Sequence, residues 1–359
     1  PYLTARLGVR FVKGLQGDDE KYLKAAACAK HFAVHSGPES LRHEFDAVVS
    51  KQDLFDTYLP AFEALVKEAK VESVMGAYNR VYGQPACASD LLTDILRNQW
   101  GFAGHFVSDC GALSDFHLHH KVTDTAPEPA ALAVKHVCDV NCGAVYLHIL
   151  TAIQEGLLTE DDITPCVERL MATRMKLGMF DKDCPYDAIP YAVNDCAEHR
   201  AVAQEAARRS QVLLKNDGLL PLDADKLSSI AVIGPNADSQ EVLKGNYNGT
   251  ASEYVTILEG IHRICDGKAR VFYSEGCPLY RDRSEGLALP GDRLGEAVAV
   301  AREADVVVLC LGLDPRIEGE EGDASNEYGA GDKAHLNLPG LQQKLLEKVV
   351  AVGKPTILV

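Results

Sequence analysis

The feature that most constrains this fold is the alternation of short apolar segments with longer amphipathic segments between Cys28 and Cys142. The apolar segments have the composition of buried strands, and the amphipathic segments have the spacing of helices. Strands are expected at 26–34, 71–78, 104–109 and 136–141, and helices at 51–70, 89–100 and 130–135. Repeated β–α units predict parallel strands with helices outside them. A closed barrel of such units has eight strands, so this region supplies only part of one.

The best candidate for a linker is residues 181–195, which combine four acids, two prolines and two tyrosines. Before it, a helix is expected at 159–179, capped by Thr159 and carrying an apolar stripe of Ile163, Val167, Leu170 and Met171. We therefore assign residues 1–180 to a partial barrel domain and residues 196–359 to a second, incomplete α/β domain.

The second domain is predicted to begin with a helix that runs into an apolar strand over 196–216. Further strands are expected at 229–233, 269–273 and 305–311, with a helix at 294–303. Because both ends of the chain lack natural boundary signals, we expect it to be a piece of a longer protein, with the rest of the barrel upstream of Pro1.

Composition limits the possible partners. A formal net charge of −16 over 359 residues opposes binding to nucleic acid, whereas a neutral ligand such as a sugar is compatible with it. No apolar run is long enough to span a bilayer, so no membrane partner is expected. The eleven cysteines lack metal-binding spacing. They are predicted to be reduced core thiols, which favours a cytoplasmic location.

Polar residues stand at the carboxyl ends of the expected strands, where a parallel β/α fold places its active site. They are Lys30, His31, Tyr78, Asn79, Ser108, Asp109, Asp139 and Asn141. Taken singly, each has an ordinary structural explanation: Asp109 could cap a helix, His31 could be a core histidine, and Tyr78 could end a strand before a turn.

Their order and spacing resemble a known family. The segments AKHFAVHSGPESLR, VMGAYNRVYGQPACAS and WGFAGHFVSDCGA are similar to three successive barrel motifs of the glycoside hydrolase family 3 enzymes. Downstream, RLMATRMKLGMF, IAVIGPNAD and LGLDPRIEGEEGD also resemble this family, so the similarity covers essentially the whole chain. It implies a truncated TIM-like barrel followed by an α/β sandwich domain, with the active site at their interface.

The resemblance also implies residue roles. Asp109 matches the nucleophile that attacks the anomeric carbon, Lys30 and His31 match a pair that binds sugar hydroxyls, Tyr78 matches a tyrosine that orients the nucleophile, and Met75 matches an apolar wall. Physical chemistry agrees, because a lysine beside a carboxylate lowers its pKa and keeps it ionised. The implied activity is that of a retaining exo-β-glycosidase with no cofactor, acting on a terminal xylose or glucose through a covalent glycosyl-enzyme.

A retaining enzyme needs a second carboxyl group to protonate the leaving group. The loop after the strand at 305–311 contains Glu318, Glu320, Glu321 and Glu327. By its distance from the segment Gly331-Asp332-Lys333, which resembles a family motif, Glu321 is favoured as the acid/base, with Glu320 as the close alternative.

Substrate preference leans toward xylose. Cys110 follows Asp109 where many glucosidases of the family carry tryptophan, and both SDC and DVNCG resemble the β-xylosidase branch. The loop after KHF lacks the proline-glycine-histidine-glycine-aspartate pattern of the N-acetylglucosaminidases, which makes that activity a distant option.

Two other classes of protein remain as alternatives. One is a catalytically silent sugar-binding relative or fragment, and the other is a dinucleotide-binding α/β protein. The segment Ile233-Gly234-Pro235-Asn236 follows a strand but lacks GxGxxG, and Pro235 offers no amide to a phosphate. The histidines His117, His119 and His120 are expected to be loop residues, not metal ligands.

Overall fold

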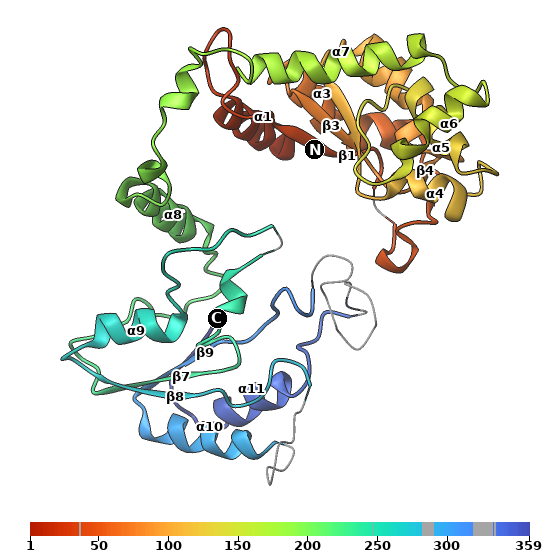
Figure 1. Cartoon of the computed structure of the whole chain (residues 1–359). Coiled ribbons are helices and arrows are strands. Elements are labelled where there is room, and N and C mark those ends of the chain that lie inside the picture. Colours follow the sequence, from red (N-terminus) through yellow and green to blue (C-terminus); the bar gives the residue numbers. More distant parts are fainter. Residues whose placement is uncertain (36, 246, 282–290, 319–332, 334) are drawn as a thin grey trace. The chain divides into compact units, whose positions relative to one another are not determined.

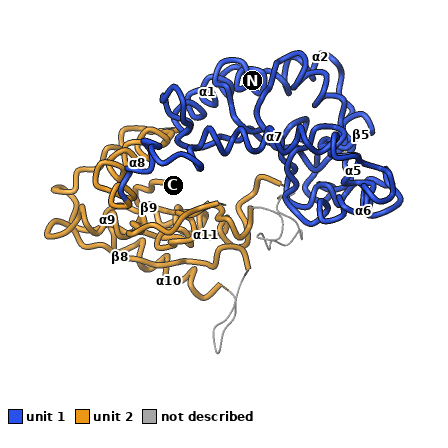
Figure 2. The backbone as a smooth tube through the Cα atoms, turned by 45° about the horizontal axis from the view of Figure 1, so that its top comes forward, with its two compact units in different colours: residues 1–190 blue, residues 191–359 orange. Residues whose placement is uncertain are grey.

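The computed structural model describes residues 1–35, 37–245, 247–281, 291–318, 333 and 335–359. The chain divides into two compact units, residues 1–190 and 191–359 (Figure 2). The division falls within the segment 181–195 that the sequence predicts as a linker. None of the described helices is long and apolar enough to cross a membrane.

Unit 1 contains a parallel sheet of three strands in the order β1-β3-β6, formed by Cys28–Phe32, Ser73–Gly76 and His105–Ser108 (Figure 1). The parallel βα pattern predicted for this region is therefore present. The fourth predicted strand, at 136–141, is wrong: it is reduced to a single bridge between Val140 and Val107. Val137 has a positive φ of 60°, which is incompatible with an extended strand and turns the chain before it can pair.

Helices surround this sheet in unit 1. They are α1 (Tyr2–Gln16), α2 (Lys51–Asp53), α3 (Pro60–Lys67), α4 (Ala112–Leu118), α5 (Pro127–Lys135), α6 (Ile149–Gln154) and α7 (Glu160–Lys176), with π-helical segments at Leu54–Tyr58 and Leu91–Gln99. The predicted helix at 89–100 is thus π-helical, and its Ser89 hydroxyl accepts from the Leu91 N–H. The core beneath these helices is built on large buried side chains, including Phe32, Phe106, Leu92 and Leu96.

A small second sheet lies beside the first. Its strands β2 (Asp46–Ala47), β4 (Arg80–Val81) and β5 (Gln84–Pro85) join the loop after β1 to the loop after β3. The two loops that carry polar residues beyond the strands are therefore held together by backbone pairing.

Helix α7 begins as expected, because Thr159 and Asp162 form a reciprocal capping box. The predicted apolar stripe is present only in part. Ile163 packs against an apolar cluster that includes Cys166, but Val167 is largely exposed, and the residues of this helix that are buried are Cys166 and Thr173. Further along, the inner face carries polar groups that bind buried carboxylates near the sheet.

One of these carboxylates is Asp139, whose side chain is 0% exposed. It accepts from Arg97 at 2.8 Å, from the Arg169 Nε of α7 at 2.8 Å and from the Phe106 N–H at 2.7 Å. Asp139 therefore joins β6, α7 and the π-helical segment Leu91–Gln99. Its partners make it a structural centre, although the sequence placed it at the end of a strand beside the site residues.

Unit 2 contains a four-stranded parallel sheet in the order β10-β9-β7-β8 (Figure 1). The strands are Thr356–Leu358, Val306–Leu309, Ser229–Ile233 and Arg270–Ser274. Helix α8 (Ala197–Ser210) ends early, and residues 211–216 form no strand, contrary to expectation.

Both faces of this sheet are covered. Alternate residues Ala231 and Ile233 pack in one apolar cluster with α10 (Asp292–Glu303) and α11 (Gln342–Val350), whereas Ile230 and Val232 pack in another with α9 (Ile257–Cys265). Because successive side chains of a strand point to opposite faces, this burial explains the continuous apolar strands of the sequence. The α/β fold class is confirmed in both units.

We predict that Asp139→Asn destabilises unit 1 by about 3–5 kcal/mol, because it leaves the largely buried Arg97 and Arg169 guanidinium groups without their counter-charge. Thermal and urea unfolding of the complete protein measure this loss. Asp18→Asn, which removes a charge from an exposed position, is the matched control and should change stability by less than about 0.5 kcal/mol. An unfolding midpoint for Asp139→Asn equal to that of the control would contradict the structural role.

Candidate active site

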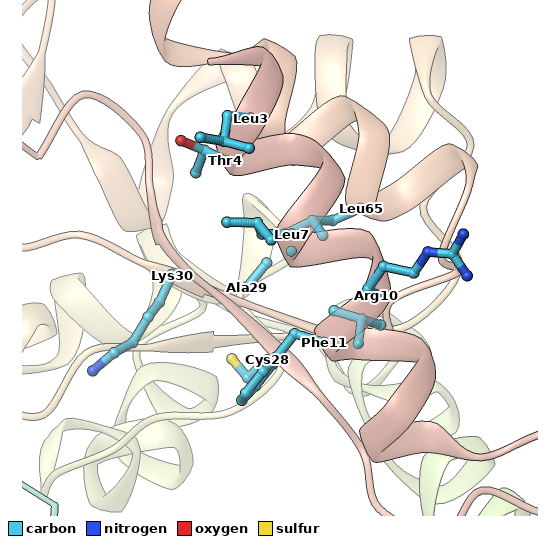
Figure 3. A pocket seen from close by; sticks show the side chains of 11 residues that line it. Leu3, Thr4, Leu7, Arg10, Phe11, Cys28, Ala29, Lys30 and Leu65 are labelled. Atoms are coloured by element: carbon cyan, nitrogen blue, oxygen red, sulfur yellow. The ribbon is translucent and has the colours of Figure 1, made fainter. Parts of the chain in front are cut away.

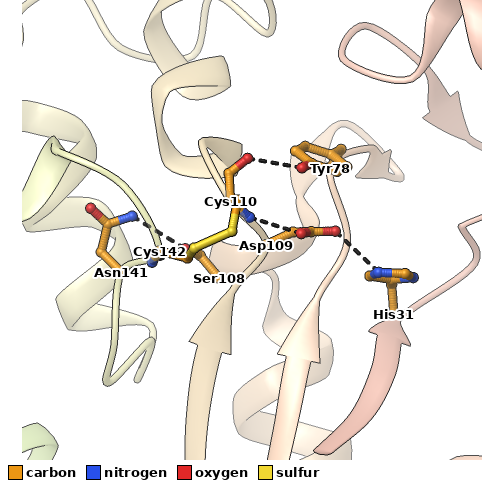
Figure 4. The surroundings of a disulfide bond; sticks show 7 residues. All are labelled: His31, Tyr78, Ser108, Asp109, Cys110, Asn141 and Cys142. Atoms are coloured by element: carbon orange, nitrogen blue, oxygen red, sulfur yellow. Dashed lines mark hydrogen bonds and ion pairs between the residues drawn. A yellow bond between two sulfur atoms is a disulfide. The ribbon is translucent and has the colours of Figure 1, made fainter. Parts of the chain in front are cut away.

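Three strand ends of unit 1 bring the predicted site residues together (Figure 4). Asp109 directly follows β6, His31 lies in β1, and Tyr78 follows β3. The His31 Nε2 is 3.1 Å from the Asp109 Oδ2, and both side chains are largely buried, at 22% and 13% exposure. A parallel sheet places the carboxyl ends of neighbouring strands at one edge, which is why residues 78 positions apart in sequence meet there.

The Asp109 carboxylate is kept ionised by its neighbours. Burial acts to raise its pKa, but the hydrogen bond from His31, the Cys110 N–H at 2.8 Å and electrostatic attraction by His31 and Lys30 outweigh burial and lower the pKa. Since an ionised carboxylate only accepts hydrogen bonds, the His31 Nε2 must be the donor. The arrangement supplies an anionic oxygen at the edge of the sheet, which is what nucleophilic catalysis requires.

Tyr78 contacts the group next to Asp109. Its hydroxyl donates to the Cys110 carbonyl at 2.8 Å, and its ring lies half-buried among the aromatic and cationic side chains of the loop after β1. Burial and the negative charge of Asp109 raise the pKa of the Tyr78 hydroxyl. It therefore stays protonated and remains a hydrogen-bond donor at neutral pH.

Lys30 and Met75 occupy the same strands as the other predicted residues. Met75 is half-buried in β3, opposite Val107 of β6. Lys30 is exposed in β1, and its side chain extends away from α1 (Figure 3). It also borders a cavity of about 870 Å³ between α1 and β1, lined mainly by apolar residues such as Leu7 and Phe11. That lining lacks the convergent polar groups of a sugar site, so this cavity differs from the Asp109 cluster in its chemistry.

A disulfide joins Cys110 to Cys142, with their Cα atoms 4.4 Å apart. The expectation that all eleven cysteines are reduced is therefore wrong for this pair, while the other nine form no disulfide. No local sequence pattern indicates this bond, because the two cysteines are 32 positions apart. Disulfides persist mainly in oxidising compartments, so the cysteines no longer favour the predicted cytoplasmic location. That location stays a prediction.

The loop after β1 contributes residues that the sequence analysis did not single out. The guanidinium of Arg42 lies 5.5 Å from the centroid of the Tyr78 ring, and the His43 ring meets Tyr78 edge-on at 4.9 Å. The Nδ1 of His43 pairs with the buried Asp115 of α4 at 2.8 Å. These contacts hold the loop against Tyr78. In the sequence, the adjacent polar residues Arg42 and His43 are the pattern that could have indicated these contacts.

Asn79 and His35 connect the loop after β3 to the loop after β1. Asn79 is buried and donates to the carbonyls of Val34 and Arg80, and its side-chain oxygen lies 3.3 Å from the His35 Nδ1. The His35 ring stacks edge-on against His31 at 5.1 Å, and burial is the main cause that lowers its pKa. His35 therefore packs against His31, the histidine that contacts Asp109.

The predicted acid/base residues Glu321 and Glu320 lie outside the described residues, as does Glu327. Glu318 is described, and its carboxylate accepts from the Lys333 N–H at 3.2 Å. The pairing of an acid with Asp109 is therefore an expectation from the sequence alone.

Within the described ranges, no group of three or more His, Cys, Asp or Glu side chains could hold a metal ion. The three histidines of the 117–120 segment have separate surroundings. His117 contacts the Thr123 carbonyl, His119 lies 3.8 Å from Asp115, and His120 is buried at 5% exposure with neither ring nitrogen hydrogen-bonded to the described protein.

The parallel sheets covered by helices make this an α/β protein, and unit 1 carries a largely buried, ionised carboxylate, Asp109, at the carboxyl edge of its sheet. Sequence profiles place it further: residues 1–173 match the Glycosyl hydrolase family 3 N terminal domain and residues 211–359 match the Glycosyl hydrolase family 3 C-terminal domain. The chain belongs to glycosyl hydrolase family 3, as its motifs predicted.

Two curated relatives show the similarity. The chain is 44% identical over 291 residues to a xylan 1,4-beta-xylosidase of Xylanibacter ruminicola, covering 79% of this chain and 33% of that protein. It is 39% identical over 372 residues to beta-D-xylosidase 1 of Arabidopsis thaliana, covering 100% of this chain and 45% of that protein. The chain thus spans less than half the length of these relatives.

Solved structures agree. A family 3 exo-beta-xylosidase in complex with a xylobiose aziridine probe matches with a TM-score of 0.89 and 32% identity, covering 99% of this chain and 45% of that chain. A beta-glucosidase of Listeria innocua in complex with glucose matches with a TM-score of 0.84 and 30% identity, covering 100% and 47%.

We predict that His120 makes stability fall in acid. Burial and the charge of Arg80 lower its pKa from 6.5 to about 4. Between pH 6.5 and pH 4, His120 binds a proton in the unfolded chain but stays neutral in the folded chain. His120 therefore leaves the free energy of unfolding undiminished above pH 6.5 and lowers it as the pH falls toward 4. His120→Gln should remove about 1–3 kcal/mol of this decline, measured as the difference in unfolding free energy at pH 7 and pH 4.5. The exposed His148→Gln is the control; if both variants keep the wild-type slope, His120 is not the source.

Proposed function

We propose that the complete protein is a retaining exo-β-glycosidase that removes terminal non-reducing β-D-xylosyl or β-D-glucosyl residues. The observation that carries the proposal is the ionised, largely buried Asp109, held by His31 and the Cys110 N–H at the carboxyl edge of the β1-β3-β6 sheet. The family assignment and the names of the relatives, xylosidases above all, support the same activity. They favour xylose as the first substrate to test.

The architecture proposed for the complete protein is a (β/α)8 barrel followed by an α/β sandwich. The parallel strands β1, β3 and β6 supply part of the barrel, and the sheet of unit 2, covered by helices on both faces, supplies part of the sandwich.

The reaction proceeds in two displacements. An Asp109 oxygen attacks the anomeric carbon and forms an ester bond to it, while the bond to the leaving oxygen breaks and that oxygen takes a proton from a carboxylic acid, which we assign to Glu321. The resulting carboxylate then removes a proton from water, and the hydroxide oxygen attacks the anomeric carbon and releases Asp109. His31 and Lys30 bind the sugar hydroxyls, Met75 forms an apolar wall, and Tyr78 holds the Cys110 peptide beside the nucleophile.

We predict that Asp109→Asn abolishes trapping by a 2-deoxy-2-fluoro-β-xyloside with a dinitrophenolate leaving group. The fluorine slows the second displacement, so the complete wild-type protein should gain the mass of one fluoroxylosyl group, on the peptide that contains Asp109. Asp124→Asn, at an exposed position of the same unit, is the control and should still be labelled.

Labelling of a different residue would overturn the assignment of Asp109. Failure of the wild-type protein to be labelled or to hydrolyse any aryl glycoside, together with retained binding of xylose, would favour the alternative that this is a catalytically silent sugar-binding relative.

We predict that the acid/base glutamate is revealed by leaving-group dependence. If it is Glu321, the Glu321→Ala variant should lose about 10²–10⁴ in kcat/KM on a xyloside with a poor leaving group, but little in the first displacement with dinitrophenolate, which needs no proton. Glu320→Ala is the matched comparison and should behave alike toward both substrates. The reverse pattern would assign the role to Glu320, and a uniform loss in both variants would place the acid elsewhere.

A further inference from the structure

We propose that the Cys110–Cys142 disulfide is a positioning element for the nucleophile, so that its reduction lowers turnover more than it weakens substrate binding. The inference rests on the proposed function, because it concerns the same Asp109. The disulfide would act through one peptide group, that of Cys110, which contacts two members of the site (Figure 4).

The Cys110 backbone is bonded in both directions. Its N–H donates to the Asp109 Oδ1 at 2.8 Å, and its carbonyl accepts from the Tyr78 hydroxyl at 2.8 Å. The N–H contact stabilises the ionised carboxylate, and the carbonyl contact fixes the tyrosine ring. A rotation of the Cys110 backbone would therefore change both the hydrogen bonds that Asp109 accepts and the position of the Tyr78 ring.

Side-chain packing does little to hold Cys110 in place. Cys110 is exposed and lies between the end of β6 and Gly111, which has a φ of 80° and open space where a Cβ would be. Gly111 therefore has no side chain that could pack against Cys110, and its own N–H is bonded to the Cys142 carbonyl. The disulfide ties the Cys110 side chain to that same residue, Cys142.

The other end of the bond is firmly anchored. The Cys142 N–H donates to the Ser108 Oγ at 3.1 Å, its carbonyl accepts from the Gly111 N–H at 2.7 Å, and Asn141 also donates to the Ser108 Oγ. The Ser108 N–H in turn donates to the Val140 carbonyl at 2.9 Å. Cys142 is thus fixed to the last residue of β6, and the disulfide transfers that fixed position to Cys110.

A disulfide that only stabilised the fold would behave differently. It would lower the unfolding temperature on reduction and leave the kinetic constants of the folded enzyme unchanged. A positioning disulfide changes kcat, because the oxygen that must reach the anomeric carbon is less well aligned. It also moves the acidic limb of the pH profile upward, because Asp109 loses a fixed donor that lowers its pKa.

The experiment compares the complete protein before and after treatment with dithiothreitol, with excess reductant removed. Two electrons and two protons from the dithiol convert the disulfide to two thiols, and the dithiol closes to its cyclic disulfide. We expect kcat on an aryl β-xyloside to fall at least about tenfold, KM to change by less than about twofold, and the acidic limb of kcat/KM to rise. Reoxidation should restore all three.

Variants separate this bond from the free thiols. Cys110→Ser/Cys142→Ser should reproduce the reduced enzyme and no longer respond to dithiothreitol, whereas Cys196→Ser, which removes a free thiol of unit 2, should respond like the wild type. Reduced wild-type protein keeps the test valid if the double variant does not fold.

Reduced enzyme with unchanged kcat and pH profile, whatever its unfolding temperature, would overturn the positioning role and leave the proposed function intact. An oxidised enzyme that neither hydrolyses xylosides nor forms the fluoroxylosyl adduct would overturn the proposed function and this inference with it.

Discussion

A carboxylate that is largely buried yet ionised requires hydrogen-bond donors that its own strand does not provide. Asp109 obtains one from His31, on the outer strand of the same parallel sheet, and one from the Cys110 N–H that follows it. The His31 contact depends on the register in which β1, β3 and β6 end at one edge, whereas the Cys110 contact joins neighbouring residues of the chain. The ionised state of Asp109 therefore depends both on the sheet register and on the anchoring of the loop that contains Cys110.

The polar side chains of unit 1 form two sets that lie in different places. Tyr78, His43 and the buried Asp115 lie beyond the strand ends, whereas Asp139 and Arg97 bind backbone groups at the amino end of β6. The first group joins the loops beside Asp109, and the second connects secondary-structure elements. A buried acid at a strand end is thus not sufficient evidence for catalysis. The partners of each acid distinguish its role: Asp139 and Glu72 pair with arginine or lysine side chains that link helices to the sheet, whereas Asp109 accepts from His31 and a backbone N–H.

Sequence reasoning found the parallel strands and brought Lys30, His31, Tyr78 and Asp109 to one edge, because apolar periodicity and strand-end position are local signals. It failed where long-range geometry decides. The segment 136–141 has a strand's composition, but the positive φ of Val137 ends the extended conformation. The Cys110–Cys142 bond and the His43–Asp115 pair join residues 32 and 72 positions apart, and no local pattern specifies such partners.

Helix α7 illustrates a further consequence of charge placed where apolar contact was expected. Its inner face is held by Arg169 on Asp139, and by Thr173 and Lys176 on the buried Glu72. Exposure of polar surface lowers the heat capacity of the unfolded state, whereas exposure of apolar surface raises it. Breaking these polar contacts should therefore add little to the heat capacity change of unfolding. They should also weaken less on cooling than contacts that depend on the hydrophobic effect.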